Sequence, residues 1–224
     1  MINLLSNLKI AVPDKFYIKD PESSDLGKRI VQNSIELIDE IGFDNFTFKK
    51  LGSKIGSNES SIYRYFDSKH KLLLYLTSWY WAWIEYQLVF VTHNVANSEE
   101  QLQKAIQVVT KSIEDDLDFS HIDTAVLNRI IINESSKSYL TKEVDLENKE
   151  GYFMVYKRVV SRLKEMITNI NPDYRFASSL ASTIVEGALH QQFLRDHFKS
   201  ITDCDETVTA TDFFTDLVTK AITK

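Results

Sequence analysis

Apolar residues recur at helical spacing along most of the chain after residue 27. In the first such segment Ile30, Ile35 and Ile38 form an apolar stripe, and Gly42 is expected to end the helix. A longer face follows, on which apolar side chains step by three or four positions: Leu72, Leu76, Trp79, Trp83, Tyr86 and Phe90. The pattern predicts helices over 28–41, 47–55, 59–66, from 68 onward, 98–118, 121–135, 139–169, 172–199 and 207–222.

Local signals support these boundaries. Thr47, Asn58 and Ser68 are each expected to cap the helix that follows, and Gly56 breaks the chain between two short helices. Pro172 stands where a helix start tolerates proline. Only 6 Gly and 3 Pro interrupt the 224 residues, and no strand alternation of useful length occurs. The sequence therefore predicts an all-α protein.

Composition narrows the cellular setting. Cys204 is the only cysteine, so an internal disulfide is excluded and a reducing compartment is favoured. The first residues make a poor signal peptide, and no apolar run approaches the ~20 residues of a membrane span. We expect a cytoplasmic protein.

The net charge of -6 is distributed unevenly. The segment 47–71 holds six positive and two negative residues, a net +4, so the rest of the chain carries -10. A basic patch on an acidic body fits a nucleic-acid contact confined to one end, although ordinary fluctuation of charge is an alternative.

The segment 47–73 has the parts of a helix-turn-helix. Its two short helices need apolar residues that hold them to a third helix, and six side chains can do this: Phe46, Phe48, Leu51, Ile55, Ile62 and Phe66. The second short helix can then enter a major groove. Its outward positions are expected to be Asn58, Glu59, Ser60, Ser61, Arg64 and Tyr65, whose polar groups suit base edges and phosphate oxygens.

Three cations occupy the first turn of the next helix. Lys69, His70 and Lys71 oppose the helix dipole there. A phosphate docked at the helix start would reverse that penalty. The alternative is that solvated lysines at this position cost little and carry no function.

The segment 28–73 resembles the DNA-binding domain of the TetR family of transcriptional regulators. The resemblance rests on this series: Ile41-Gly42-Phe43, Thr47, Leu51-Gly52, Ile55-Gly56, Ser61-Ile62-Tyr63-Arg64-Tyr65-Phe66, Ser68-Lys69 and Leu72-Leu73. It implies an extension over 1–27, a three-helix DNA-binding domain over 28–73 and a larger helical domain for ligand binding and dimerisation over 74–224.

The resemblance also implies roles for single residues. Thr47 caps the second helix and contacts phosphate, and Lys49 lies near the groove or the DNA backbone. Tyr63 and Lys69 match the family's phosphate anchors, whereas the family varies at Arg64. The recognition surface would consist of Asn58, Glu59, Ser60, Ser61 and Tyr65.

Three residues put parts of this picture in doubt. Gly52 stands where the family usually has alanine, and a glycine inside a helix would leave the two short helices loosely packed. Ser57 replaces a small apolar residue of the turn. Glu59 repels phosphates, so it either accepts a hydrogen bond from cytosine or interacts only with the start of its own helix.

The last two predicted helices carry material for a dimer. Ala177, Ala181, Val185 and Ala188 lie close to one face of the first. The second has a compact apolar face of Phe213, Phe214, Leu217, Val218 and Ala221. Packing within one chain is the alternative, but the family resemblance favours a homodimer through these helices, which would read a palindromic operator in double-stranded DNA.

A ligand cavity is expected from the resemblance. Candidate lining residues are Trp79, Trp83, Tyr86, Phe90, Tyr152, Tyr156, Glu186 and His190. An aromatic stripe is more often core than pocket, so this set is a hypothesis that points to a largely apolar small molecule.

We therefore expect a ligand-responsive dimeric repressor, released from its operator by an unknown effector. No sequence motif of a hydrolase, metalloprotease or nucleotide-binding enzyme appears, and no ligand spacing for zinc. We expect neither catalysis, nor a cofactor, nor a bound metal. The alternative is a helical interaction protein that has lost specific DNA binding.

Overall fold

The computed structural model describes residues 10–111 and 121–223. Within these ranges the chain is helical and contains no β-sheet, which confirms the predicted all-α class. It divides into two compact units, each made of two stretches of chain. The first comprises residues 1–82 and 113–153, and the second comprises residues 83–112 and 154–224.

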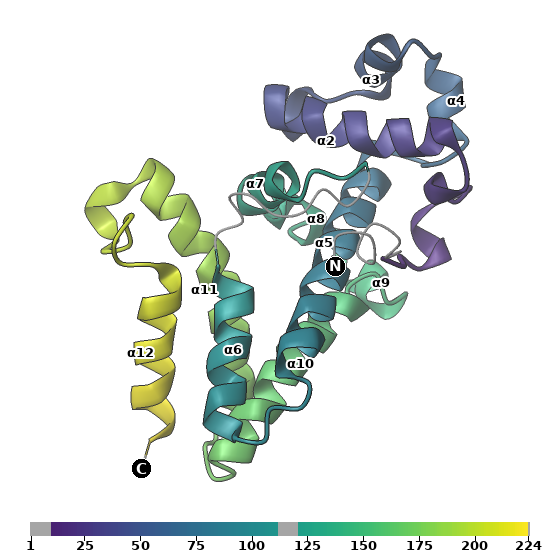
Figure 1. The fold of residues 1–224 in the computed structure, drawn as a ribbon. Helices are drawn as coiled ribbons and strands as arrows, with labels where there is room; N and C mark the ends of the chain where they lie inside the picture. The colour runs from purple at the N-terminus through teal and green to yellow at the C-terminus, as the bar shows by residue number, and fades with distance from the viewer. Residues whose placement is uncertain (1–9, 112–120, 224) are drawn as a thin grey trace. The chain divides into compact units, whose positions relative to one another are not determined.

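The first unit is built around a three-helix head. Helix α2 (Asp25–Asn45) packs against α3 (Phe48–Ile55), and α3 packs against α4 (Glu59–Tyr63) (Figure 1). The six apolar side chains expected to hold the head together are all buried: Phe46, Phe48, Leu51, Ile55, Ile62 and Phe66. Gly42 has a φ of 74°, so the helical backbone breaks where the sequence predicted.

The same unit contains the start of α5 (Lys69–Thr92), then α7 (Thr124–Glu134), α8 (Ser136–Tyr139) and α9 (Val144–Lys149). Helix α7 packs against α2, where Arg129 forms two hydrogen bonds with the carboxylate of Asp39. The predicted helix over 139–169 is wrong as one element. Leu140 leaves the helical region and Gly151 has a φ of 82°, so the range is divided among α8, α9 and α10 (Met154–Ile170).

The N-terminal segment is folded against this unit. It includes the short helices η1 (Asp14–Phe16) and η2 (Pro21–Ser23). Phe16 is buried and meets the ring of Tyr152 edge-on at 4.9 Å between centroids. Gly27 has no space for a β-carbon because the backbone of Pro21 lies there. The segment is thus packed onto both α2 and the chain that follows α9.

The second unit is a helical bundle. Helix α6 (Ser98–Thr110) packs against α10, α11 (Ala177–His197) and α12 (Ala210–Ile222), and α11 also packs against α10 and α12 (Figure 1). The short helix η3 (Lys199–Ile201) follows α11. Helix α11 begins at Ala177, so the predicted start at Pro172 is wrong. The predicted helix over 98–118 ends at Thr110, and residues 112–118 lie outside the described part.

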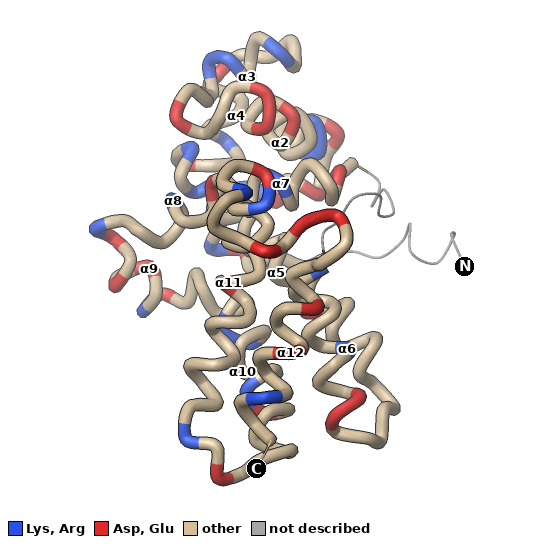
Figure 2. The backbone as a smooth tube through the Cα atoms, turned by 90° about the vertical axis from the view of Figure 1, so that its left-hand side faces the viewer, with Lys and Arg blue, Asp and Glu red and all other residues tan. Residues whose placement is uncertain are grey.

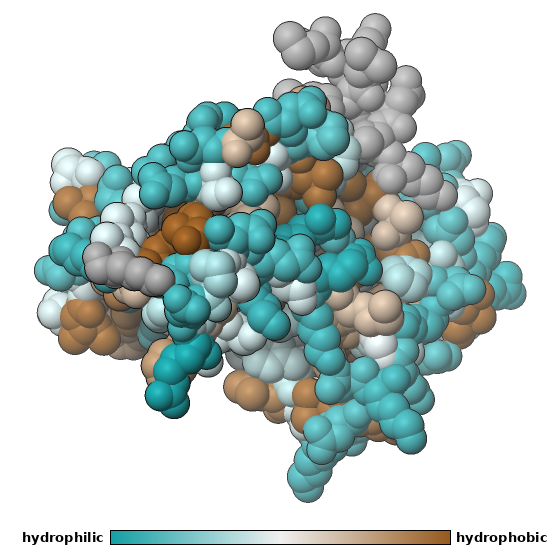
Figure 3. Space-filling view, turned by 90° about the horizontal axis from the view of Figure 1, so that it is seen from below, coloured by the Kyte–Doolittle hydropathy of each residue, from teal (hydrophilic) through white to brown (hydrophobic). Residues whose placement is uncertain are grey.

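None of the described helices is long and apolar enough to cross a membrane. Seen from below, apolar side chains form separate patches between hydrophilic ones (Figure 3).

Candidate nucleic-acid interface

The turn between α3 and α4 is closely packed. Gly56 adopts a left-handed conformation with φ 63°, and the N–H of Ser57 donates to the carbonyl of Gly52 at 2.8 Å. A β-carbon on Gly52 would lie 2.8 Å from the carbonyl oxygen of Ser57, closer than real β-carbons approach. The expectation that Gly52 loosens the head is therefore wrong: its missing side chain lets the turn approach the helix.

The predicted caps are confirmed. Thr47 Oγ1 accepts from the N–H of Lys50 at 3.2 Å, and Ser68 Oγ accepts from the N–H of Lys71 at 3.2 Å. Asn58 Oδ1 accepts three hydrogen bonds, from the N–H of Ser61 and from the hydroxyls of Ser60 and Ser61. The caps fix where α3, α4 and α5 begin.

One face of α4 is polar and open to solvent. Asn58, Glu59 and Ser60 are exposed, and Ser61 is half-buried. The amide of Asn58 keeps its N–H donors, while the two serine hydroxyls are already donated to Asn58. The face therefore offers donors from Asn58 and mostly acceptors from Glu59, Ser60 and Ser61.

Three further predicted residues border this face. Tyr63 is 47% exposed and its ring meets Phe48 edge-on at 5.0 Å. The side chains of Lys49 and Arg64 are exposed and have no hydrogen-bond or ion-pair partner within the described part of the chain. Tyr63 therefore packs against the head and keeps about half of its surface exposed, and the two cations extend from the same region without such a partner among the described residues.

Tyr65 does not lie on the outward face, which corrects the prediction for its position. Its side chain is 3% exposed, and its hydroxyl lies 2.8 Å from Ser24 Oγ. The N-terminal segment covers it: the N–H of Ile18 donates to the carbonyl of Tyr65, and the ammonium of Lys19 lies over its ring. Burial raises the pKa of the Tyr65 phenol, but the contacts with Ser24 and Lys19 outweigh burial and lower it.

Lys69 is also engaged within the protein. Its ammonium donates to the carbonyls of Phe43, Asp44 and Phe46 at 3.0, 3.1 and 3.2 Å, at the C-terminal end of α2. These three bonds use all three N–H groups of a lysine and place its charge at the negative end of the helix dipole. In this conformation Lys69 stabilises the end of α2 and has no donor left for a phosphate.

The other cations of the basic segment are partly neutralised. Lys54 pairs with Glu36 and Glu40 of α2. His70 Nε2 lies 3.0 Å from the buried carboxylate of Glu147, and Lys71 Nζ lies 3.4 Å from it. Burial lowers the pKa of the Lys71 ammonium, but the contacts with Tyr152 and Glu147 raise that pKa by a larger amount. The pKa is therefore above its ordinary value, and Lys71 stays charged. Figure 2 accordingly shows both signs of charge on α2 to α4.

The residues proposed for a ligand pocket occupy varied surroundings. Trp79 and Trp83 are buried, Tyr86 and Tyr156 are half-buried, and Phe90 is exposed. Tyr86 and Phe90 stack on each other with centroids 6.3 Å apart.

The remaining three residues of that set are equally dispersed. Tyr152 is buried in the first unit, where its hydroxyl donates to the carbonyl of Lys15. Glu186 is half-buried and His190 is exposed, both on α11. None of the eight residues lines either of two cavities that the described part of the second unit contains, among others.

The small-residue face of α11 is directed into its own unit. Ala177, Ala181, Val185 and Ala188 are all buried within one chain. On α12, Phe214 and Val218 are buried, so the apolar face predicted for this helix is divided between the interior and the surface. The outward part holds Phe213, Leu217 and Ala221, with Phe213 exposed and the others half-buried.

Comparison with known proteins supports the geometry of the head. Residues 30–76 match the family model described as "Bacterial regulatory proteins, tetR family". No protein in a search of curated proteins matches the chain.

Solved structures share the fold at low identity. The fatty acid degradation regulator FadR from Bacillus halodurans is 16% identical, covers 95% of this chain and 94% of its own, and has a TM-score of 0.58. AibR in complex with isovaleryl coenzyme A and operator DNA is 16% identical, covers 85% and 95%, and has a TM-score of 0.55.

A third structure shows why this likeness is limited to fold. It is described as the superantigen PfiT and is 18% identical, covering 90% of this chain and 97% of its own with a TM-score of 0.58. Because one fold hosts different functions, the structural likeness alone does not assign an activity. The match over residues 30–76 confirms the resemblance seen in the sequence: this part of the chain is similar to the tetR family of bacterial regulatory proteins, and the solved structures share the fold.

Proposed function

We propose that this protein is a dimeric transcriptional regulator that binds duplex DNA through α4. The observation that carries the proposal is the division of α4 into two faces. On the inner side of α4, Ile62 is buried in the head. On the outer side, Asn58, Glu59 and Ser60 form an exposed polar row. A short helix presented in this way fits a major groove and meets base edges with its N-terminal residues.

The contacts divide into reading and anchoring. Asn58, Glu59, Ser60 and Ser61 read base edges, with Glu59 accepting from cytosine or adenine amino groups. Phosphates are met by Thr47, Lys49, Tyr63 and Arg64, which border the reading face. Tyr65 and Lys69 support the head from inside, because their polar groups are bound within the chain.

Two copies are needed for an operator of useful length. A single short helix contacts few base pairs, so a two-fold dimer reading two half-sites multiplies both affinity and specificity. The outward apolar residues of α12 support a dimer through the last two helices. A palindromic operator follows from the symmetry.

We infer that the protein represses transcription and that a small molecule releases it. The AibR structure holds both operator DNA and isovaleryl coenzyme A, and a regulator from Saccharomonospora viridis is described in complex with choline. For this chain, an effector would act by binding one arrangement of the dimer better than the other.

Selection of binding sites from a random duplex library tests the proposal. The full-length protein should enrich a palindrome, and its affinity should fall linearly with the logarithm of salt concentration because phosphate contacts release counterions. The selection is run both in buffer and in cell extract, because the extract would supply a small molecule if DNA binding requires one. Enrichment of no sequence under either condition would refute a DNA-binding regulator.

A helical interaction protein without DNA binding is the second candidate. The observation in its favour is that Lys54, Lys69 and Lys71 contact groups of their own chain. The two candidates differ at Lys49 and Arg64, whose charges matter only if phosphates are bound. Replacing Lys49 with Met and Arg64 with Gln in the same protein should abolish duplex binding if the first candidate is right. If the second candidate is right, the two substitutions should change no measured interaction.

A further inference from the structure

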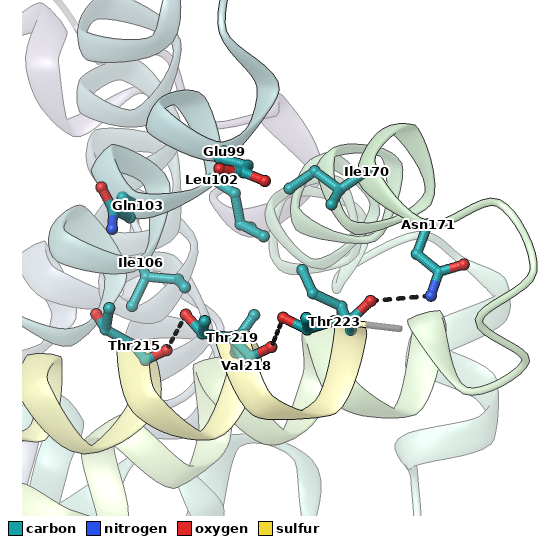
Figure 4. Close-up of a pocket in the computed structure, with 11 residues that line it drawn as sticks. Glu99, Leu102, Gln103, Ile106, Ile170, Asn171, Thr215, Val218, Thr219 and Thr223 are labelled. Carbon is teal, nitrogen blue, oxygen red and sulfur yellow. Dashed lines mark hydrogen bonds between the residues drawn. The ribbon is translucent and has the colours of Figure 1, made fainter.

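A cavity of about 410 Å³ opens between α6, the end of α10 and α12 in the second unit (Figure 4). None of the residues expected to bind ligand from the sequence lines it. Its floor is apolar: Leu102, Ile106, Val218 and Ile222 are all buried and lie beneath it. A volume of this size is within the range of small-molecule sites.

Two threonine hydroxyls at the cavity already donate to carbonyls of their own helix. Thr219 Oγ1 donates to the carbonyl of Thr215 at 2.7 Å, and Thr223 Oγ1 donates to the carbonyl of Thr219. Asn171 Nδ2 donates to the carbonyl of Ile222 at 2.9 Å (Figure 4). A hydroxyl whose proton is used can only accept, so Thr219 and Thr223 present oxygen lone pairs to an incoming molecule.

In the described part of the chain, the cavity has one charged side chain and the ends of two helices on its rim. Among the described residues that line the cavity, Glu99 is the only charged one, and Figure 4 shows it across the cavity from Thr219 and Thr223. The C-terminal ends of α10 and α12 both reach the cavity, at Ile170 and Ile222. Helix C-termini carry partial negative charge and favour cations.

We infer that this cavity binds an amphipathic amine, with the alkyl or aryl body on the apolar floor and the protonated nitrogen between Glu99 and the threonine oxygens. A carboxylate or phosphate would be repelled by Glu99 and by the negative ends of two helix dipoles. A neutral alcohol would keep the apolar contact and lose the charge-assisted hydrogen bonds. The inference deepens the proposed function by naming a class of effector, and it depends on that function for the effector role alone.

Isothermal titration calorimetry of the full-length protein without DNA tests the site. The probes are n-octylamine, 1-octanol and octanoate, which share a chain and differ in the head group. We expect n-octylamine to bind about threefold or more tightly than 1-octanol, and octanoate to bind least. Equal affinities, or octanoate binding as well as the amine, would overturn the inference.

A pair of substitutions in one helical turn locates the head group. Glu99→Gln should weaken n-octylamine about threefold and leave 1-octanol unchanged, because only the charged contact is lost. Glu100→Gln is the matched control, since Glu100 lies in the same turn, pairs with Lys104 and does not line the cavity. Equal effects of the two substitutions would show that the amine responds to overall charge and does not sit beside Glu99.

A filling variant locates the body. Thr219→Trp, at an exposed position that tolerates bulk, should abolish binding of both n-octylamine and 1-octanol while circular dichroism stays unchanged. Retained binding by the folded variant would place the ligand elsewhere and overturn the site. Because no DNA is present in these titrations, their failure removes the amine site and leaves the DNA-binding proposal to the library selection.

Discussion

Gly52 and Gly56 stand four residues apart and serve different needs. At Gly52 there is no room for a β-carbon beside the carbonyl of Ser57, while at Gly56 there is open space but a left-handed backbone. We predict that Gly52→Ala lowers the free energy of unfolding by about 1–3 kcal/mol, because overpacking the turn outweighs the gain in helix propensity. Urea unfolding followed by circular dichroism measures the change.

Substitutions at Gly56 separate packing from backbone strain. Gly56→Ala should cost about 1–2 kcal/mol through the left-handed conformation. Gly56→Asn should cost less, because asparagine tolerates that region. A Gly52→Ala protein as stable as the wild type would mean that the turn relaxes readily, and the close approach would then have no energetic weight.

Lys69 and Lys49 allow stability to be separated from DNA affinity. Lys69→Met should lower the free energy of unfolding by about 1–3 kcal/mol, because three carbonyls at the end of α2 lose their donor. Lys49→Met should leave stability within about 0.5 kcal/mol. It should reduce the slope of log affinity against log salt by about 1.8, because one phosphate contact is lost at each of the two half-sites.

Chemical unfolding and fluorescence anisotropy on the selected operator measure the two quantities. If Lys69→Met is fully stable yet flattens the salt dependence, Lys69 leaves the end of α2 in the complex and anchors phosphate, as the family resemblance implied. That result would restore the role that the free structure does not show.

Residue-scale prediction succeeded where the determining contacts are local. Thr47, Asn58 and Ser68 cap helices through N–H groups three residues away, so sequence alone locates them. The burial of Tyr65 could not be predicted in this way, because its partner Ser24 lies 41 positions earlier.

At the scale of elements, the predicted helix over 139–169 shows where periodicity is insufficient. One break falls at Gly151, between Glu147, which is buried against His70, and Tyr152, which packs on Phe16. Each contact joins residues more than seventy positions apart and draws the backbone out of a single helix. The apolar pattern of α10 was found from sequence, while its beginning depends on contacts that no local pattern contains.

The carboxylate of Glu85 links α5 to α10 in the second unit through two ion pairs. Arg158 and Arg162 both donate to it, and its side chain is 12% exposed. Burial raises the pKa of Glu85, but the two arginines outweigh burial and lower it below the ordinary value of 4.5. A lowered folded pKa means that the stabilisation is present above that ordinary value and is lost as pH falls through the folded one.

We predict that Glu85→Gln lowers the free energy of unfolding by about 1–2 kcal/mol at pH 7, allowing for solvent screening of the half-exposed guanidinium groups. The difference from wild type should shrink below pH 4.5. Asp216→Asn is the control, because that carboxylate pairs with Lys220 in an exposed position and should contribute little. A difference that stays constant down to pH 3 would show that packing, and not charge, is lost.

At the scale of the whole molecule, the sequence was sufficient to predict the fold class and the helix-turn-helix. It was not sufficient to predict the dimer interface, because this requires knowing which face of α12 is exposed in the folded chain. Gly187 has no space for a β-carbon because the ring of Phe214 lies 2.6 Å from that position. This contact turns Phe214 and Val218 inward and leaves Phe213 outward. The apolar face read from the sequence is therefore two faces, of which one remains for a partner.

We predict that Phe213→Glu converts the dimer to a monomer and weakens operator binding at least about tenfold, because two linked half-site contacts become one. Phe213 is 43% exposed, so the substitution spares the interior of its own chain. Phe90→Glu is the matched control: the same chemical change at a side chain that is 72% exposed and lies outside the last two helices. Sedimentation velocity and anisotropy measure both variants. A Phe213→Glu protein that stays dimeric would move the interface away from α12, and the palindromic operator would then need a different arrangement of the two heads.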